Sequence, residues 1–251
     1  MCRFLAMVAA QAVELRACLQ AGPRSLAELS REHPDGWGVA LFEPRGRAWE
    51  VHRGVERALD CVRFRALAAA TRASVLIGHI RQKTVGPTSL ENTHPFACAQ
   101  GRWVFAHNGT VTDVAYLRAH TAPERADEVR GDTDSERLFA FLLTRLDEVG
   151  LTGAPASAAT DRLLAETCAE LRARPGMGAF NFLLSDGEST YAHRFGRSMF
   201  LLERPNGEAI VASEQLTSEP WALVEEGALI RMDRAPETKI EHAPRHLRRV
   251  A

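Results

Sequence analysis

The stretch GAFNFLLSDGESTYAHRFGRSMFLLERPNGEAIVAS, residues 178–213, decides the fold class of this 251-residue chain. Short apolar segments alternate in it with Asp-Gly and Asn-Gly pairs, which are strong signals for tight turns between antiparallel strands. The apolar segments WALVEE and ALIRMD continue the series to residue 233. The C-terminal third therefore predicts an antiparallel β meander.

More strands and most of the helices are predicted before this region. Apolar runs predict strands at residues 3–10, 37–42, 49–53, 73–82 and 102–107. Helical patterns occur at about 25–31, 55–72, 133–149 and 161–174. The third pattern opens with a Thr-x-x-Glu capping box at Thr133 and Glu136. Since strands and helices do not alternate regularly, we predict an α+β fold with antiparallel sheets.

Composition and charge narrow the function classes. Lys and Arg number 31 against 32 for Asp and Glu, so the net charge of -1 gives no reason to expect a nucleic-acid partner. Five cysteines without a Cys-x-x-Cys pair predict reduced thiols in a cytoplasmic protein and no metal site. We also expect no signal peptide, no membrane span and, without a Gly-rich phosphate loop, no nucleotide cofactor.

Cys2 follows the initiator Met1 directly. Loss of Met1 would give this residue both a thiol nucleophile and a free α-amine that can carry its proton near neutral pH. This combination is suited to acyl transfer through a thioester. The alternative is a small residue that only opens the buried strand at 3–10.

Asn108 and Gly109 follow the predicted strand at 102–107. Asn-Gly is the strongest short signal for a hairpin turn, and that is the structural alternative here. At such a turn, an amide side chain and a backbone N–H can also point at one oxygen and form an oxyanion hole.

Arg81 and Asp134 could together recognise the charged groups of a free amino acid. Arg81 ends an apolar strand, where its guanidinium either forms a surface ion pair or binds a carboxylate in bidentate fashion. Asp134 follows the predicted N-cap Thr133, where it either complements the helix dipole or accepts an α-ammonium group. A Cys-His dyad with His33, His79, His94 or His107 is a weaker alternative for activating Cys2.

An ordered set of short motifs resembles the class II glutamine amidotransferases, which are N-terminal nucleophile (Ntn) hydrolases. The later FNFLLSDG and IVASEQLT extend the resemblance to the short single-domain members. The motifs are Met1-Cys2-Arg3-Phe4-Leu5, Asp35-Gly36-Trp37-Gly38, Gly78-His79-Ile80-Arg81, Glu91-Asn92-Thr93-His94-Pro95-Phe96, Ala106-His107-Asn108-Gly109 and Thr133-Asp134-Ser135-Glu136.

This resemblance implies one domain over residues 2–251 with a four-layer αββα sandwich of two antiparallel sheets. It implies that Cys2 is the nucleophile, and that Asn108 and Gly109 form the oxyanion hole. Arg81 would bind the α-carboxylate of glutamine and Asp134 its α-amine. Thr84 corresponds to a pocket residue, and His94 would support the pocket wall.

The sequence departs from the family pattern in two places. Sugar-aminating and phosphoribosyl-aminating members place an aromatic residue after the arginine, whereas Gln82 and Lys83 follow Arg81 here. The chain also ends near residue 250 without a synthase domain to receive ammonia. In this it is similar to stand-alone members, some of which cleave γ-glutamyl amides in ergothioneine synthesis or, with a partner, in glutathione degradation.

Three hypotheses of function follow. The first is a glutaminase-type amidohydrolase that releases glutamate and ammonia, with an ammonia-accepting synthase or partner subunit as a candidate partner. The second is a hydrolase of a γ-glutamyl peptide or thiol conjugate. The third is a non-catalytic partner or regulatory subunit. In all three the ligand is a small molecule, and a homo-oligomer is compatible with the sequence.

Overall fold

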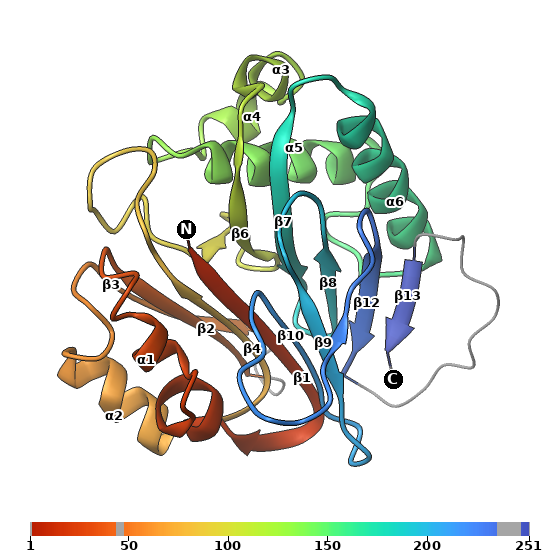
Figure 1. The fold of residues 1–251 in the computed structure, drawn as a ribbon. Helices are drawn as coiled ribbons and strands as arrows, with labels where there is room; N and C mark the ends of the chain where they lie inside the picture. The colour runs from red at the N-terminus through yellow and green to blue at the C-terminus, as the bar shows by residue number, and fades with distance from the viewer. Residues whose placement is uncertain (1, 44–47, 235–246, 251) are drawn as a thin grey trace.

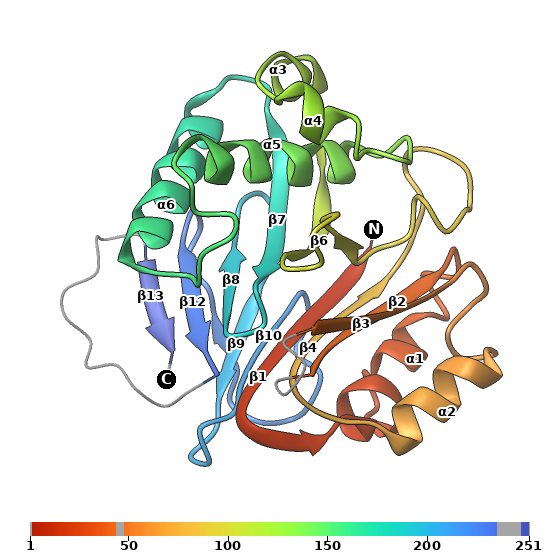
Figure 2. The ribbon, with the colours of Figure 1, turned by 180° about the vertical axis from the view of Figure 1, so that it is seen from behind.

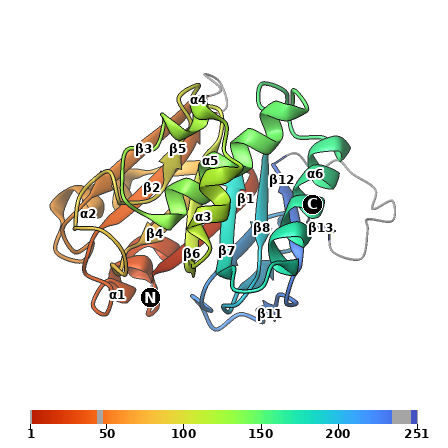
Figure 3. The same cartoon turned by 90° about the horizontal axis from the view of Figure 1, so that it is seen from above.

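Two β-sheets pack face to face in the computed structural model, which describes residues 2–43, 48–234 and 247–250. Helices cover the outer face of each sheet (Figures 1 and 2). Seen from above, α1 and α2 lie at one end of the molecule and α6 at the other (Figure 3). The predicted four-layer αββα arrangement is confirmed.

The first sheet has seven strands in the order β11-β9-β10-β1-β4-β2-β3. All of its neighbouring strands are antiparallel. Its strands are β1 (Arg3–Glu14), β2 (Trp37–Glu43), β3 (Ala48–Gly54), β4 (Arg72–Ile80), β9 (Phe200–Glu203), β10 (Ala209–Ala212) and β11 (Ala222–Leu223).

The second sheet has six strands in the order β13-β12-β8-β7-β6-β5. Its pairs are antiparallel except for β12 and β13, which are parallel. Its strands are β5 (Phe96–Ala97), β6 (Val104–Val111), β7 (Gly178–Ser185), β8 (Ser189–His193), β12 (Leu229–Asp233) and β13 (Leu247–Val250).

Separate groups of helices cover the two sheets, and the two longest, α5 and α6, cover the second. The first group is the π-helical turn η1 (Ala17–Ala21), α1 (Leu26–Leu29) and α2 (Val62–Ala70). The second group is α3 (Val114–Ala119), α4 (Pro123–Ala126), α5 (Asp134–Glu148) and α6 (Ala158–Ala173). Half of the predicted capping box of α5 is present, because the Thr133 hydroxyl accepts the Glu136 N–H at 3.3 Å. The Glu136 carboxylate accepts the N–H groups of Arg130 and Gly131 instead of that of Thr133.

The C-terminal strands form two hairpins in different sheets, so the prediction of one continuous meander was wrong. β7 and β8 pair in the second sheet, and β9 and β10 pair in the first. The chain then returns to the second sheet with β12. Each hairpin follows its turn signal, but the choice of sheet depends on long-range packing that short motifs do not encode.

Asn108 and Gly109 lie inside β6, so the strand does not end at residue 107 as predicted, and the hairpin turn named as the alternative for this pair is absent. β6 continues to Val111 and pairs with β7 along its length, with Asn108 opposite Asn181 and Gly109 opposite Phe180. A Cβ on Gly109 would lie 2.1 Å from the Ala179 oxygen. The glycine therefore permits a close approach of two strands rather than a turn.

Side chains of alternate residues fill the layer between the sheets. Successive side chains of a strand point to opposite faces, so one residue in two faces the other sheet. These residues are small or apolar, and they form one buried cluster. It includes Phe4, Ala6 and Val8 of β1, Val75 and Ile77 of β4, and Val104 and Ala106 of β6.

Gly38 of β2 is required where the loop before β5 crosses the first sheet. A Cβ on Gly38 would lie 1.9 Å from the His94 oxygen and 2.8 Å from Pro95 Cδ. We expect Gly38→Ala to lower the free energy of unfolding by about 1–3 kcal/mol in urea denaturation, because the loop backbone must move.

Gly153→Ala is the matched control, since a Cβ at Gly153 meets no atom within 4 Å. That variant should remain within about 0.5 kcal/mol of the parent. Equal stability of the two variants would contradict the close contact at Gly38.

Candidate active site

Three strands bring the candidate site together at the rim of the layer between the sheets. Cys2 comes directly before β1. It lies two residues before Phe4, whose side chain faces the other sheet, so the Cys2 side chain faces the other sheet as well. By the same alternation, Arg81 follows the residues of β4 that face the layer between the sheets, and Asn108 follows those of β6. Figure 1 shows the N-terminus beside β6.

The Cys2 thiol contacts the main chain of Gln82. Its Sγ donates to the Gln82 carbonyl at 3.3 Å, and the Gln82 N–H donates to Sγ at 3.4 Å. The Gln82 side chain in turn meets buried His33, with Oε1 3.3 Å from Nδ1. No histidine of the described residues hydrogen-bonds the thiol, so the Cys-His dyad does not form.

The segment after β10 fixes the main chain beside Cys2. The Ser213 N–H donates to the Phe4 carbonyl at 3.1 Å, and the Phe4 N–H donates to the Ser213 hydroxyl oxygen at 3.2 Å. Arg3 pairs with Glu214 and donates to the Cys2 carbonyl at 3.1 Å. Cys2 is therefore held on both sides by main-chain and charged contacts.

Burial raises the pKa of the Cys2 thiol above its usual value, although the contact with Gln82 and the charge of Arg81 act in the opposite direction. The thiol is thus protonated at neutral pH in this chain. Its own amine cannot take the proton, because that nitrogen is part of the peptide bond with Met1.

Arg81 is buried and holds the following loop. Its guanidinium donates to the Pro87 carbonyl at 2.9 Å and to the Val85 carbonyl at 3.1 Å. Asn92 Nδ2 also donates to the Pro87 oxygen, at 3.2 Å. These contacts use two of the five N–H groups of the guanidinium, so others are available for a ligand.

Six of the seven predicted site residues line one small cavity. Its volume of about 20 Å³ has room for a single water molecule. His107, Thr133 and Ser135 also contribute to the lining. The six are Cys2, Arg81, Thr84, His94, Gly109 and Asp134.

Asn108 is the one predicted residue outside this lining. Its side chain is buried, and its Oδ1 has no hydrogen-bond partner. Its Nδ2 donates to no atom of the described residues. A free amide donor therefore lies at the inter-sheet rim next to the cavity wall formed by His107 and Gly109.

Asp134 joins the first turn of α5 to the end of β6. Its Oδ2 accepts the Val111 N–H at 2.6 Å, while Oδ1 has no partner in the described part of the chain. His107 makes a second link, because its Nδ1 lies 2.8 Å from the Ser135 hydroxyl. The sequence indicated His107 only as a partner in a Cys-His dyad. Because His107 lies two residues before Gly109, both residues lie on the same face of β6.

His79 and His94 stack behind the cavity, with ring centroids 4.1 Å apart. All four ring nitrogens are buried without a partner. Burial lowers the pKa of His79 to about 3 and the pKa of His94 well below its usual range. Both imidazoles are therefore neutral, and His94 forms part of the cavity wall.

No group of three His, Cys, Asp or Glu side chains could hold a metal ion within residues 2–43, 48–234 and 247–250. All five cysteines are free thiols. In the same ranges, no helix is long and apolar enough to cross a membrane.

A family model for class II glutamine amidotransferases matches residues 1–208, which include all seven predicted site residues. The chain belongs to the class II glutamine amidotransferase family. Thus the resemblance inferred from the motifs is confirmed, as is the expectation of an Ntn-type enzyme.

Two curated relatives are similar to the chain over different lengths. It is 33% identical over 164 residues to YafJ of Escherichia coli, whose name assigns it to the glutamine amidotransferases. That match covers 64% of this chain and 60% of YafJ. It is 28% identical over 244 residues to a gamma-glutamyl-hercynylcysteine sulfoxide hydrolase of Mycobacterium tuberculosis, which covers 92% of this chain and 93% of the relative.

A solved structure shares the amidotransferase fold. The glutamine aminotransferase class-II domain protein from Silicibacter pomeroyi superposes with a TM-score of 0.64 at 23% sequence identity. The superposition covers 94% of this chain and all of that protein. At this identity the likeness establishes the fold and no more.

The lowered pKa values of the buried histidines make the stability of this protein depend on pH. An unfolded histidine binds a proton below about pH 6.5, whereas folded His79 does so only near pH 3. The unfolded state therefore binds more protons between these values, and stability falls as the pH falls through this window. Each such histidine should contribute a slope of about 1.4 kcal/mol per pH unit.

We expect His79→Phe to reduce this slope by about 1 kcal/mol per pH unit in urea denaturation, averaged between about pH 6.5 and 5, because an unfolded histidine is half protonated at the upper end of this range. The parent chain, measured under the same conditions, supplies the reference slope. An unaltered slope in His79→Phe would mean that His79 is not buried in its neutral form.

Proposed function

We propose that this chain hydrolyses the side-chain amide of glutamine, or of another γ-glutamyl compound, through a thioester on Cys2. One observation carries the proposal. A thiol, a guanidinium and a carboxylate line the same cavity, from Cys2, Arg81 and Asp134. These are the groups needed to attack an amide while binding the two charged groups of an amino acid.

In the first step, Cys2 Sγ forms a bond to the amide carbon of the substrate. With Met1 removed, the α-amine of Cys2 takes the thiol proton and passes it to the leaving nitrogen. The carbon–nitrogen bond breaks and ammonia or an amine departs. Water then attacks the thioester, which releases the γ-carboxylate of glutamate and restores the thiol.

The contacts of each side chain support its proposed role. Arg81 has N–H groups left for the α-carboxylate, and Asp134 Oδ1 is open to the α-ammonium group. Thr84 and His94 are proposed as pocket walls. The free Nδ2 of Asn108, together with Gly109, would stabilise the oxyanion.

The size of the cavity implies that the loop after Arg81 moves when substrate binds. A volume of about 20 Å³ excludes glutamine while the loop carbonyls of Val85 and Pro87 lie on Arg81. A substrate carboxylate is a stronger acceptor for guanidinium than a carbonyl. It can therefore replace these two contacts as the loop shifts.

A γ-glutamyl conjugate is the second candidate substrate. The observation in its favour is the match to the gamma-glutamyl-hercynylcysteine sulfoxide hydrolase, which extends over nearly the whole of both chains. Parallel turnover assays with glutamine, a γ-glutamyl dipeptide and a γ-glutamyl thiol conjugate separate the two. The substrate with the highest kcat/KM identifies the natural class.

We expect Cys2→Ala to abolish amide hydrolysis and covalent labelling by a glutamine analogue that carries a diazoketone. Cys61→Ala is the matched control, because this second thiol lies outside the cavity lining. A Cys2→Ala protein with unchanged turnover would exclude the mechanism.

Met1 must be absent for this activity. A chain whose N-terminal extension cannot be removed should therefore be inactive and unlabelled, whereas specific cleavage that exposes Cys2 should restore both properties. Mass spectrometry of each preparation establishes the first residue. Absence of turnover in a chain verified to begin at Cys2 would favour a non-catalytic regulatory subunit.

Asn108→Ala should lower kcat by about 10²–10³, because one oxyanion donor is lost. The thermal unfolding midpoint should remain near that of the parent, since Asn108 Nδ2 bonds to no described residue. Pre-steady-state labelling of Cys2 distinguishes this loss from a failure to bind. An unchanged kcat would remove Asn108 from the oxyanion hole.

A further inference from the structure

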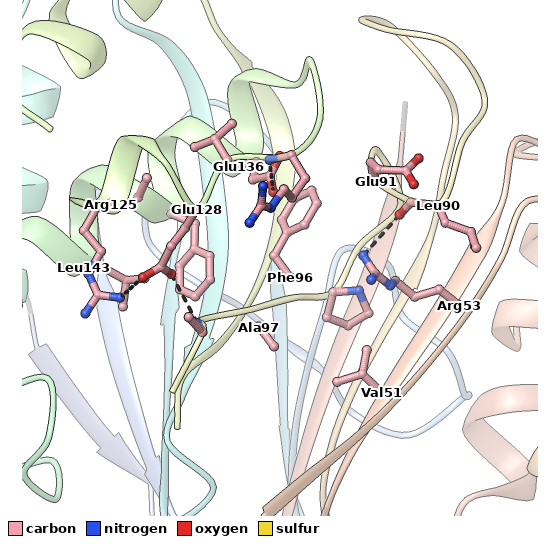
Figure 4. Close-up of a pocket in the computed structure, with 16 residues that line it drawn as sticks. Val51, Arg53, Leu90, Glu91, Phe96, Ala97, Arg125, Glu128, Glu136 and Leu143 are labelled. Carbon is pink, nitrogen blue, oxygen red and sulfur yellow. Dashed lines mark hydrogen bonds and ion pairs between the residues drawn. The ribbon is translucent and has the colours of Figure 1, made fainter. Parts of the chain in front are cut away.

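A second cavity of about 550 Å³ adjoins the candidate active site (Figure 4). Segment 90–95 separates the two. Its residues Leu90, Glu91 and Pro95 line the larger cavity, whereas Asn92 and His94 line the small one. The volume lies within the range of about 300–1,000 Å³ that is typical of small-molecule sites.

The floor of this larger cavity is apolar, and it is formed by strands from both sheets and by α5. Side chains from β3, β5 and α5 meet there, with Phe96 at the centre of the view in Figure 4. Aromatic and aliphatic surface of this kind favours a flat apolar ligand. The residues are Val51, Pro95, Phe96, Ala97, Phe139 and Leu143.

Two of the acidic side chains in the cavity already have partners. Glu136 accepts the main-chain N–H of Arg130 at 3.0 Å and that of Gly131 at 2.7 Å. Glu128 accepts from Arg125 at 2.7 Å and from the Ala99 N–H at 3.2 Å. Glu128 is therefore paired with an arginine, whereas Glu136 is hydrogen-bonded by neutral N–H groups and acts electrostatically on Arg53.

Two arginines retain free donor groups. Arg53 uses one nitrogen, Nη1, to donate to the Leu90 carbonyl at 3.1 Å and the Thr93 carbonyl at 3.2 Å. Its Nε and Nη2 have no partner among the described residues. The Arg130 guanidinium likewise forms no ion pair with any residue that the structure describes. The exposed carboxylate of Glu91 is held by its own main-chain N–H and by Ser89, and it lies near Arg53.

We propose that this cavity binds a small organic anion with a flat apolar body and one carboxylate. The apolar floor would hold the body, and the free N–H groups of Arg53 and Arg130 would hold the carboxylate. Arg53 also holds segment 90–93, so the ligand would contact a group that supports the wall of the catalytic cavity. The proposal concerns binding and does not depend on the reaction at Cys2.

The test compares 2-naphthoate with its neutral analogue 2-naphthamide by isothermal titration calorimetry on the full chain. We expect naphthoate to bind about tenfold more tightly, as charge-assisted hydrogen bonds predict. Arg130→Gln should lower naphthoate affinity several-fold and leave naphthamide unchanged. Arg53→Gln should also lower naphthoate affinity. Because Arg53 also donates to the carbonyls of Leu90 and Thr93, its loss can move this segment, so Arg130→Gln tests the charge alone.

Two further variants make the test specific to this cavity. Ala97→Trp should abolish binding of both probes, because exposed Ala97 lines the cavity and a large side chain there fills it. Arg118→Gln removes the same charge from α3 outside the cavity and should have no effect. The proposal is overturned if naphthoate does not bind, binds no better than naphthamide, or binds equally well to Ala97→Trp.

Discussion

Close packing of two sheets determines where the reactive groups of this protein lie. The inward side chains of β1, β4 and β6 are small or apolar along the layer, with Phe4, Ile77 and Ala106 as examples. At the rim the same alternation continues with polar residues, so Cys2, Arg81 and Asn108 all face the layer between the sheets. A slip of one residue in any of these strands would turn its functional side chain to the opposite face.

The polar groups at this rim are positioned by contacts that leave part of their bonding capacity free. Arg81 holds two loop carbonyls and retains further donors, while Asp134 binds the Val111 N–H through one oxygen only. His107 fixes the beginning of α5 through Ser135. A rigid scaffold with unused donors and acceptors is the arrangement that a selective binding site requires.

Local patterns in the sequence predicted much of this structure. Helix α5 was predicted from its capping box and apolar spacing, and most strands from their apolar runs. Cys2, Arg81 and Asp134 were singled out by residue type at the ends of predicted elements, and they do line one cavity. Helices α3 and α4 were not predicted, because elements of six and four residues carry too little periodicity.

The errors concern long-range pairing. Asn108-Gly109 has the composition of a turn, yet β7 pairs with it on β6 and keeps the strand extended. The hairpins β7-β8 and β9-β10 were recognised, but their division between two sheets depends on partners distant in the chain. The larger cavity beside segment 90–95 had no sequence signal, since its lining comes from separate elements.

The contact of Cys2 with the main chain of Gln82 has a consequence for substitution at position 82. Carbonyl and N–H groups are present in every residue except proline, which lacks the N–H. Any other side chain at this position therefore leaves both contacts of the thiol available, although it would replace the contact between Gln82 Oε1 and His33. The placement of the nucleophile thus depends on the backbone of residue 82 and not on the identity of its side chain.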